Sequence, residues 1–357
     1  MIKTNYNILA LMSGTSLDGI DIIYVNFSFK NVWCFNIIKA ETVKYSTEWK
    51  LTLSQLVTKK NDELENIDLN YSKHLADVIS DFSDRNNIES IDFIASHGHT
   101  ALHQPENGLT YQIGNNQILA DKLNQKVICD FRVQDVEFGG QGAPLVPIGD
   151  ELLFSKYDYC LNLGGFANVS FEFNNERIAF DICPVNIVLN HYVSIINLEY
   201  DDKGQLASTG TINKKLLSIL NQLQFYKENP PKSLGLEWVD MNIFPLIDSF
   251  KLQIKDILRT FIEHIAIQIS KILDKEKSNV LITGGGVYND FLISRINHHS
   301  VSEIVIPKNE IVEFKEGLIF GLLGVLKDRN EVNCLMSVTG ANQNHSSGKI
   351  LMPKNQL

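Results

Sequence analysis

The segment Ser13–Asp21 (SGTSLDGID) concentrates residue types that could bind a phosphate group. Its glycines allow backbone N–H groups to approach phosphate oxygens, and its hydroxyls are further donors. The carboxylates of Asp18 and Asp21 would repel phosphate, so they are better suited to hold Mg²⁺, directly or through water. A plain β-hairpin turn stays open as the alternative, because Asp-Gly favours such turns. The residues that would form this candidate site, including the two carboxylates for Mg²⁺, are Gly14, Thr15, Ser16, Leu17, Asp18, Gly19, Ile20 and Asp21.

Two later glycine-rich turns could contribute to the same site if its ligand is a nucleotide. Gly284, Gly285 and Gly286 lie between an apolar run and an amphipathic pattern, which predicts a strand, a turn and a helix N-terminus that attracts anions. Gly164 and Gly165 form a second such turn. Tight connections without a ligand are the alternative for both. The chain has neither a G-x-x-x-x-G-K-[ST] P-loop nor a G-x-G-x-x-G fingerprint.

Asp181 could supply acid–base chemistry. It stands in a predicted strand over 179–184, shortly before a predicted helix that starts near residue 186. A carboxylate in that place can be a general base at the edge of a cleft or an N-terminal helix cap. The residues alone favour the cap.

Histidines and an arginine lie at or after the ends of two other predicted strands, 91–98 and 127–132. His97, His99 and His103 raise the possibility of zinc, but no cysteine or paired carboxylate nearby completes a ligand set, so a polar loop lining a pocket is preferred. Arg132 could clamp a carboxylate or a phosphate, with an ordinary surface ion pair as the alternative.

The elements that must position these residues fall into two similar series. An apolar run, a glycine turn and a second apolar run occupy residues 6–27, and the same plan returns at 159–173. This predicts a degenerate structural duplication and two α/β halves with a cleft between them. Helical spacing covers 246–275, and the glycine-dotted run 315–327 predicts a helix that packs closely against a neighbour.

The bulk composition excludes several classes of protein. A net charge of −10 without a basic cluster argues against nucleic acid as a partner. The five cysteines are scattered and form no C-x-x-C pair, which indicates a reducing compartment. No signal-peptide core or membrane span is present, so we expect no membrane partner and a cytoplasmic protein.

Several motifs together resemble the anhydro-N-acetylmuramic acid kinase family. They are LMSGTSLDGID, SHGHT, QIGNNQ, DFR, GGQGAPLVP, LNLGGFANVS, FD-x-x-P-x-N, TGGGVYN and SVTGA, in order from about residue 7 to 341. The resemblance implies the fold of acetate and sugar kinases and actin-like ATPases, with two RNase H-like domains around a nucleotide and sugar cleft. We expect the first domain to comprise 1–132 with 336–357 and the second to comprise 133–335.

The resemblance also implies a reaction, in which ATP and water convert 1,6-anhydro-N-acetylmuramic acid to N-acetylmuramic acid 6-phosphate and ADP during cell-wall recycling. It implies Mg²⁺ as cofactor, a homodimer, Asp181 as the base that activates water, and the Gly14–Asp21 turn as part of the ATP site. The sugar would contact His97, Thr100, Arg132, Asn186 and Glu316.

One segment departs from the family pattern. Ile182-Cys183-Pro184-Val185 stands where the family has Thr-Gly-Pro-Gly. A kinase for a related amino sugar, or a sugar-independent ATP-binding regulator or ATPase, therefore stays open.

Overall fold

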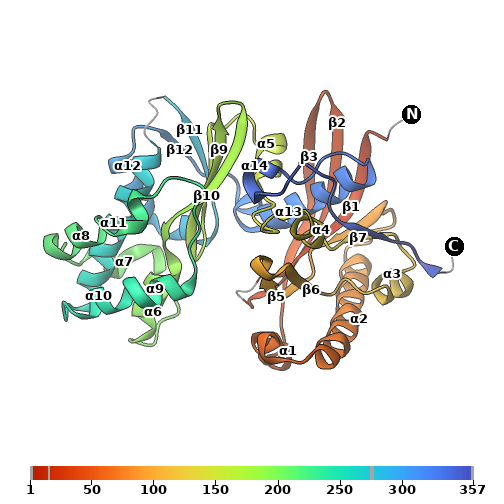
Figure 1. The fold of residues 1–357 in the computed structure, drawn as a ribbon, viewed down its shortest axis with the longest axis horizontal. Coiled ribbons are helices and arrows are strands. Elements are labelled where there is room, and N and C mark those ends of the chain that lie inside the picture. The colour runs from red at the N-terminus through yellow and green to blue at the C-terminus, as the bar shows by residue number, and fades with distance from the viewer. Residues whose placement is uncertain (1–2, 15–16, 274–276, 355–357) are drawn as a thin grey trace. The chain divides into compact units, whose positions relative to one another are not determined.

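The computed structural model describes residues 3–14, 17–273 and 277–354 (Figure 1). Its internal contacts divide the chain into two compact units, each built around one mixed β-sheet with helices. Unit 1 is Met1–Leu153 with Phe314–Leu357, and unit 2 is Phe154–Glu313.

The sheet of unit 1 has the order β13-β7-β4-β1-β2-β3. The first three strands in sequence form an antiparallel meander, and β4 and β7 continue the sheet parallel to β1. Its strands are β1 (Asn5–Met12), β2 (Gly19–Lys30), β3 (Val32–Lys44), β4 (Phe93–Ser96), β7 (Val127–Cys129) and β13 (Lys349–Leu351). A separate hairpin joins β5 (His99–Gln104) and β6 (Leu109–Ile113).

The sheet of unit 2 repeats this plan in the order β10-β9-β8-β11-β12. Here too an antiparallel meander is followed by two strands parallel to the first. The strands are β8 (Tyr159–Leu163), β9 (Phe166–Phe173), β10 (Glu176–Pro184), β11 (Asn279–Thr283) and β12 (Glu303–Val305). The shared topology is that of an RNase H-like domain, so the predicted duplication and fold class are confirmed, whereas the cleft between the domains stays a prediction.

Helices complete both units. Those of unit 1 include α1 (Thr47–Ser54), α2 (Asn61–Arg85), α3 (Ile118–Leu123), α4 (Val133–Glu137), α5 (Pro147–Leu153) and α14 (Met336–Thr339). Those of unit 2 are α6 (Asn186–Ser194), α7 (Gln205–Ser208), α8 (Lys214–Leu220), α9 (Leu236–Asn242), α10 (Phe244–Asp248), α11 (Ile254–Ile272) and α12 (Asp290–His299). Helix α13 (Asn309–Asp328) begins in unit 2 and continues in unit 1.

Glycines let α13 lie close against the sheet of unit 1. A Cβ at Gly321 would lie 3.0 Å from Ile8 and 3.1 Å from Ala10, and one at Gly324 would lie 2.9 Å from Ala95. Only glycine permits this approach without a shift of the neighbours. The close packing predicted for 315–327 is confirmed.

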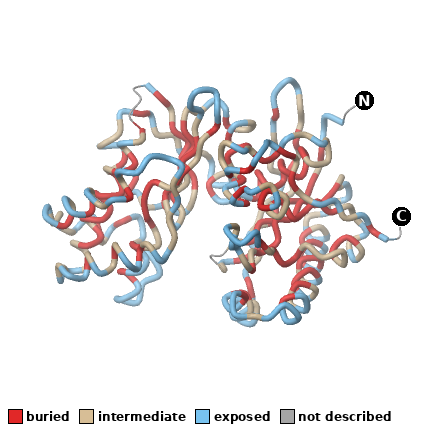
Figure 2. The backbone as a smooth tube through the Cα atoms, viewed as in Figure 1, coloured by how far each residue is buried: buried red, intermediate tan, exposed pale blue. Residues whose placement is uncertain are grey.

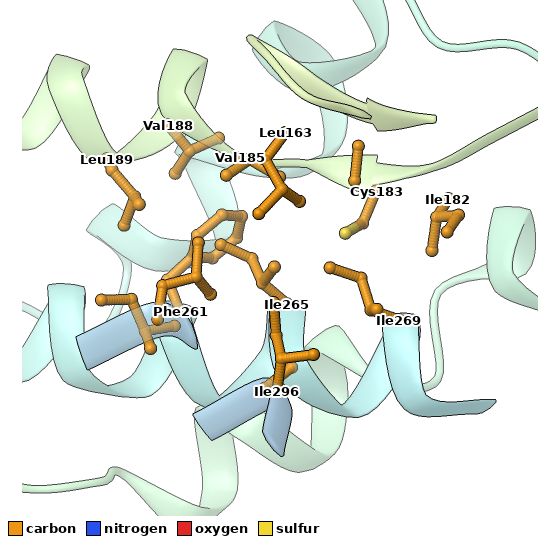
Figure 3. Packing of buried hydrophobic residues seen from close by; sticks show 14 of the residues in the cluster. Leu163, Ile182, Cys183, Val185, Val188, Leu189, Phe261, Ile265, Ile269 and Ile296 are labelled. Carbon is orange, nitrogen blue, oxygen red and sulfur yellow. The ribbon is translucent and has the colours of Figure 1, made fainter. Parts of the chain in front are cut away.

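Apolar packing explains the Ile182-Cys183-Pro184-Val185 segment. The central strands of each sheet are largely buried (Figure 2), and Cys183 and Val185 are both 0% exposed. Figure 3 shows them in one apolar cluster with Ile265 and Ile269 of α11. The side chains that replace two family glycines therefore fill the core of unit 2, where apolar burial stabilises the fold.

The division of the chain differs from the predicted domain boundaries. Residues 133–153 and 314–335, which were expected in the second domain, belong to unit 1. The reason is that Asp135 of α4 accepts a hydrogen bond from Thr339 Oγ1 (2.8 Å), while α13 packs against β1 and β4. Among the described residues, no helix is both long and apolar enough to cross a membrane.

Candidate active site

Parallel strands bring three predicted segments of unit 1 to one edge of its sheet. Strands β1, β4 and β7 are mutually parallel and end at Met12, Ser96 and Cys129. The residues after them include Ser13, His97 and Arg132. Because the carboxyl ends of parallel strands meet at one edge, this is where open α/β sheets place ligands.

His97 and Arg132 are in direct contact at this edge. Arg132 Nε donates to His97 Nε2 (2.9 Å), so Nε2 is the unprotonated nitrogen, and Nδ1–H then donates to the Gly98 carbonyl (2.9 Å). Burial and the positive charge of Arg132 hold the pKa of His97 well below its usual range. The imidazole is therefore neutral at pH 7 and positions the guanidinium.

The guanidinium of Arg132 is held from a second side as well. Its Nη1 donates to the Gly142 carbonyl (2.7 Å). Burial lowers the pKa of Arg132 to about 10, and the negative charge of Glu316 on α13 acts in the opposite direction. Arg132 stays charged at neutral pH, and Glu316 is exposed to solvent near it. The structure thus brings together three of the predicted sugar contacts, whereas Thr100 lies in β5 opposite Gln112.

The predicted phosphate-binding turn connects β1 and β2. Thr15 and Ser16 lie outside the described residues. Leu17 has a positive φ of 60°, and a Cβ at Gly19 would lie only 2.5 Å from the Val43 carbonyl oxygen, so β3 requires glycine there. Asp18 is exposed, whereas Asp21 accepts a hydrogen bond from Thr42 (2.6 Å). Asp18 is therefore the carboxylate better placed to reach a cation in solution.

A chain of hydrogen bonds anchors the start of this turn. Ser13 Oγ lies 2.8 Å from His99 Nδ1 and 2.5 Å from the Tyr45 hydroxyl, which in turn lies 2.5 Å from the Tyr71 hydroxyl. Burial lowers the pKa of His99 to about 4, so its ring is neutral at pH 7. The sequence analysis did not identify Tyr45 and Tyr71, because they are distant in the chain and lie in an apolar core. The pairing of Ser13 with His99 could have been suspected only because both are polar residues that follow buried strands.

The glycine turns of unit 2 lie beside each other. Strands β8 and β11 are adjacent and parallel, and they end at Leu163 and Thr283, directly before the two turns. Gly284 has φ +86°, and a Cβ there would lie 2.4 Å from Asn162 Oδ1. A Cβ at Gly286 would lie 2.7 Å from Leu163 Cβ. The predicted nucleotide residues Gly164, Gly165, Gly284, Gly285 and Gly286 therefore share one edge.

Asn186 lies at the same edge, at the start of α6. Its Nδ2 donates to the Leu163 carbonyl (3.4 Å), and its backbone N–H donates to the Gly164 carbonyl (3.3 Å). The side chain thus ties the helix to the end of β8.

A row of polar residues crosses the sheet of unit 2 next to these turns. In register, Asp181 of β10 pairs with Asn168 of β9, Asn168 with Asn162 of β8, and Asn162 with Thr283 of β11. Residues paired in register point to the same face of a sheet. Asp181 therefore stands on one face with polar groups from three other strands.

The environment of Asp181 suits a base rather than a cap. The N-cap of α6 is Val185, with no side-chain cap bond, so Asp181 does not cap that helix. Its Oδ2 accepts a hydrogen bond from the Leu234 N–H (2.8 Å). Burial raises the pKa of Asp181, and the Leu234 bond partly opposes this. A raised pKa brings a carboxylate closer to the range in which it accepts protons efficiently.

Two RNase H-like units with glycine turns at the carboxyl ends of their central strands define the actin-like ATPase and sugar kinase class of protein. The model of one family, anhydro-N-acetylmuramic acid kinase, matches residues 6–353. The chain belongs to this family, and it is a kinase.

Named relatives agree with this placement. The anhydro-N-acetylmuramic acid kinase of Bacillus cereus (strain 03BB102) is 32% identical and covers 97% of this chain and 99% of its own length. The anhydro-N-acetylmuramic acid kinase of Haemophilus influenzae is 31% identical, and the match covers 96% of this chain and 97% of that protein. Among solved structures, the activator of the 2-hydroxyisocaproyl-CoA dehydratase from Clostridium difficile with bound ADPNP has a TM-score of 0.43 and 13% identity, covering 87% of this chain and 91% of that one. A similarity this distant carries no information on the site.

Proposed function

We propose that the protein uses ATP and water to convert 1,6-anhydro-N-acetylmuramic acid to N-acetylmuramic acid 6-phosphate. The observation that carries this proposal is the polar row of unit 2, in which Asp181 lies partly buried beside the glycine turns. A water molecule needs a base to attack the anomeric carbon, and a carboxylate of raised pKa is suited to that task.

Asp181 would accept the proton of the attacking water at its free carboxylate oxygen. Oδ2 is already engaged by the Leu234 N–H, so Oδ1 is the oxygen that can face water. The attack breaks the bond between the anomeric carbon and the bridging oxygen O6, and O6 takes the γ-phosphoryl group of ATP. Positioning and charge stabilisation are enough for this transfer, without a covalent enzyme intermediate.

The ATP phosphates would be bound by the backbone N–H groups of the glycine turns. The candidates are Gly14, Thr15, Ser16, Leu17, Asp18, Gly19, Ile20 and Asp21 in unit 1 and Gly164, Gly165, Gly284, Gly285 and Gly286 in unit 2. A Mg²⁺ ion bound with ATP would neutralise phosphate charge, and Asp18 fits as its water-mediated partner because its carboxylate is exposed.

The sugar carries a lactyl carboxylate, which Arg132 is suited to bind. Its guanidinium is held in place by His97 and by the Gly142 carbonyl, so little side-chain freedom is lost on binding. Glu316 would accept hydrogen bonds from sugar hydroxyls, and Thr100 and Asn186 are further candidate contacts.

The cellular setting rests on the family alone. We propose a role in peptidoglycan recycling in the cytoplasm and a homodimeric state, which light scattering of the purified protein would test.

The deciding assay measures ADP release with Mg²⁺ and a panel of amino sugars. We expect release to depend on 1,6-anhydro-N-acetylmuramic acid and to yield a 6-phosphate. Turnover only with N-acetylmuramic acid or N-acetylglucosamine would support the alternative, a kinase for a related amino sugar. ADP release that is independent of any sugar would indicate an ATPase or an ATP-binding regulator. This alternative remains because two glycines of the family pattern are replaced in the Ile182–Val185 segment.

A further inference from the structure

A buried group of metal-ligating side chains lies in unit 1. It consists of Asp135 of α4, Cys334 and His345, which are 0%, 1% and 6% exposed. One ligand atom from each lies within 4.8 Å of the others, and no other such group occurs in the described ranges. Asp135 lies 199 residues before Cys334 in the chain, so the fold and not a local motif brings it to Cys334 and His345.

The orientation of His345 is that of a metal ligand. Its Nδ1 lies 3.1 Å from the Gln343 carbonyl oxygen, an acceptor, so Nδ1 carries a proton. In the neutral ring Nε2 is then a bare lone pair. Nε2 is buried and has no hydrogen-bond partner among the described residues, and Asp135 Oδ1 lies 3.6 Å away, beyond hydrogen-bond distance. A bond from the far ring nitrogen to a backbone carbonyl is how metal-bound histidines are oriented.

Asp135 is oriented in a similar way. Its Oδ2 accepts the Gly142 N–H (2.7 Å), and its Oδ1 accepts a hydrogen bond from the Cys334 thiol (3.0 Å) and lies 3.6 Å from His345 Nε2. Thr339 Oγ1 also donates to Oδ1 (2.8 Å). The carboxylate is thus fixed by one oxygen while the other faces the thiol and the imidazole.

From these contacts we propose that Asp135, Cys334 and His345 bind a Zn²⁺-class divalent ion. Tetrahedral zinc with bonds of about 2.0–2.3 Å places its ligand atoms roughly 3.5 Å apart. The recorded separations of 3.0 and 3.6 Å lie on either side of that value. A thiolate, an imidazole and a carboxylate favour zinc over Mg²⁺ or Ca²⁺, which take oxygen ligands. Binding releases the thiol proton of Cys334 to solvent, and a thiolate and a carboxylate then balance the charge of the ion.

The site has a structural consequence. Cys334 and His345 pair across a β-bridge that closes the segment containing α14 and the Thr339-Gly340-Ala341 turn. An ion bound by Cys334, His345 and Asp135 would fix this segment to α4. Asp135 is three residues from Arg132 in the chain. The histidines that sequence reasoning weighed for zinc are engaged elsewhere: His97 with Arg132, His99 with Ser13, and His103 with Thr110.

Metal content of the full-length protein tests the proposal. Protein is incubated with Zn²⁺, freed of excess ion and analysed for zinc, and Co²⁺ is substituted to detect thiolate-to-cobalt charge transfer. We expect about one zinc ion per chain and a charge-transfer band. Cys334→Ser should remove the band and lower zinc affinity about tenfold or more. The matched controls Cys129→Ser, another buried thiol of unit 1, and His103→Gln should retain both.

Two results would overturn the proposal. One is wild-type protein that retains no zinc and shows no charge-transfer band. The other is undiminished zinc binding by Cys334→Ser. If Cys334→Ser does not fold by circular dichroism, His345→Gln decides instead: it should keep the cobalt thiolate band at reduced affinity, and unchanged affinity would count against the site.

Discussion

Arg132 donates from Nε to Nε2 of His97 over 2.9 Å, and this bond fixes both the tautomer of the buried imidazole and the direction of the guanidinium. A lysine has no Nε–H fork and cannot keep this bond while also reaching a ligand. The pair therefore sets the geometry of the proposed carboxylate clamp.

Arg132→Lys should weaken sugar binding more than it affects ATP. A lost charged hydrogen bond is worth about 1.5–3 kcal/mol, so we expect the KM for the sugar to rise about 10- to 100-fold while the KM for ATP changes little. Steady-state kinetics with each substrate varied in turn give the answer. An equal rise in KM for both substrates would indicate that Arg132 supports the folding of this edge of the sheet and does not bind the sugar specifically.

Asp181→Asn should lower turnover about 10²- to 10⁴-fold, because the amide cannot accept the proton of water. It should not destabilise the protein, since burial disfavours the ionised carboxylate and an amide oxygen can still accept the Leu234 N–H. Kinetics and thermal unfolding of the same preparation separate the two effects. Asn168→Ala, in the same row, is the matched control and should lose less activity.

Wild-type activity should also depend on pH through Asp181. The base must be ionised, so kcat/KM should fall as the pH drops through a pKa that lies above the usual range for aspartate. A profile that stays flat down to the ordinary aspartate range would assign the base elsewhere.

Gly284→Ala tests the glycine turn of unit 2. Gly284 has φ +86° and ψ 163°, a backbone region open essentially to glycine alone, so alanine there costs roughly 1–3 kcal/mol, and the clash with Asn162 Oδ1 at 2.4 Å adds to that. Gly108→Ala is the control: Gly108 also has a positive φ, +67°, but in the left-handed helical region (ψ 20°), and nothing lies within 4 Å of the added methyl. We expect urea unfolding to show a larger decrease in the free energy of unfolding for Gly284→Ala than for Gly108→Ala. The KM for ATP should rise in Gly284→Ala alone. Equal losses would mean that the turn can relax.

His99 should make stability depend on acid. Its folded-state pKa of about 4 lies below the usual 6.5, so the unfolded chain binds the proton first as the pH falls. The free energy of unfolding should therefore fall from pH 6.5 to about 4. His99→Gln should reduce that slope, whereas His298→Gln, at an exposed position, should leave it unchanged. If His99→Gln leaves the pH dependence of the free energy of unfolding unchanged, the lowered pKa of His99 is contradicted.

Much of the architecture was predictable because buried strands and amphipathic helices leave periodic patterns. The strands before His97 and Arg132, the second series from 159, and the α13 glycines all followed from such patterns. The β5–β6 hairpin and the long exposed strand β3 were not predicted, since their residues alternate too weakly to mark a buried face.

The partners within the site could not be predicted. Ser13 meets His99 across 86 residues, and Asp135 meets Cys334 across 199, and only the tertiary fold creates these contacts. The residues around Asp181 favoured a cap, because a carboxylate before a helix is usually one. The structure places Asp181 within β10, as the predicted strand over 179–184 required, but makes Val185 and not Asp181 the N-cap of α6.

The most direct test of the proposed reaction follows the oxygen of water. Wild-type protein is incubated with ATP, Mg²⁺ and 1,6-anhydro-N-acetylmuramic acid in ¹⁸O-labelled water, and the products are analysed by mass spectrometry. We predict one ¹⁸O on the anomeric carbon of N-acetylmuramic acid 6-phosphate and none in its phosphate group. Label in inorganic phosphate with the sugar unchanged would contradict the proposal, because ATP would then be hydrolysed without opening the anhydro bond.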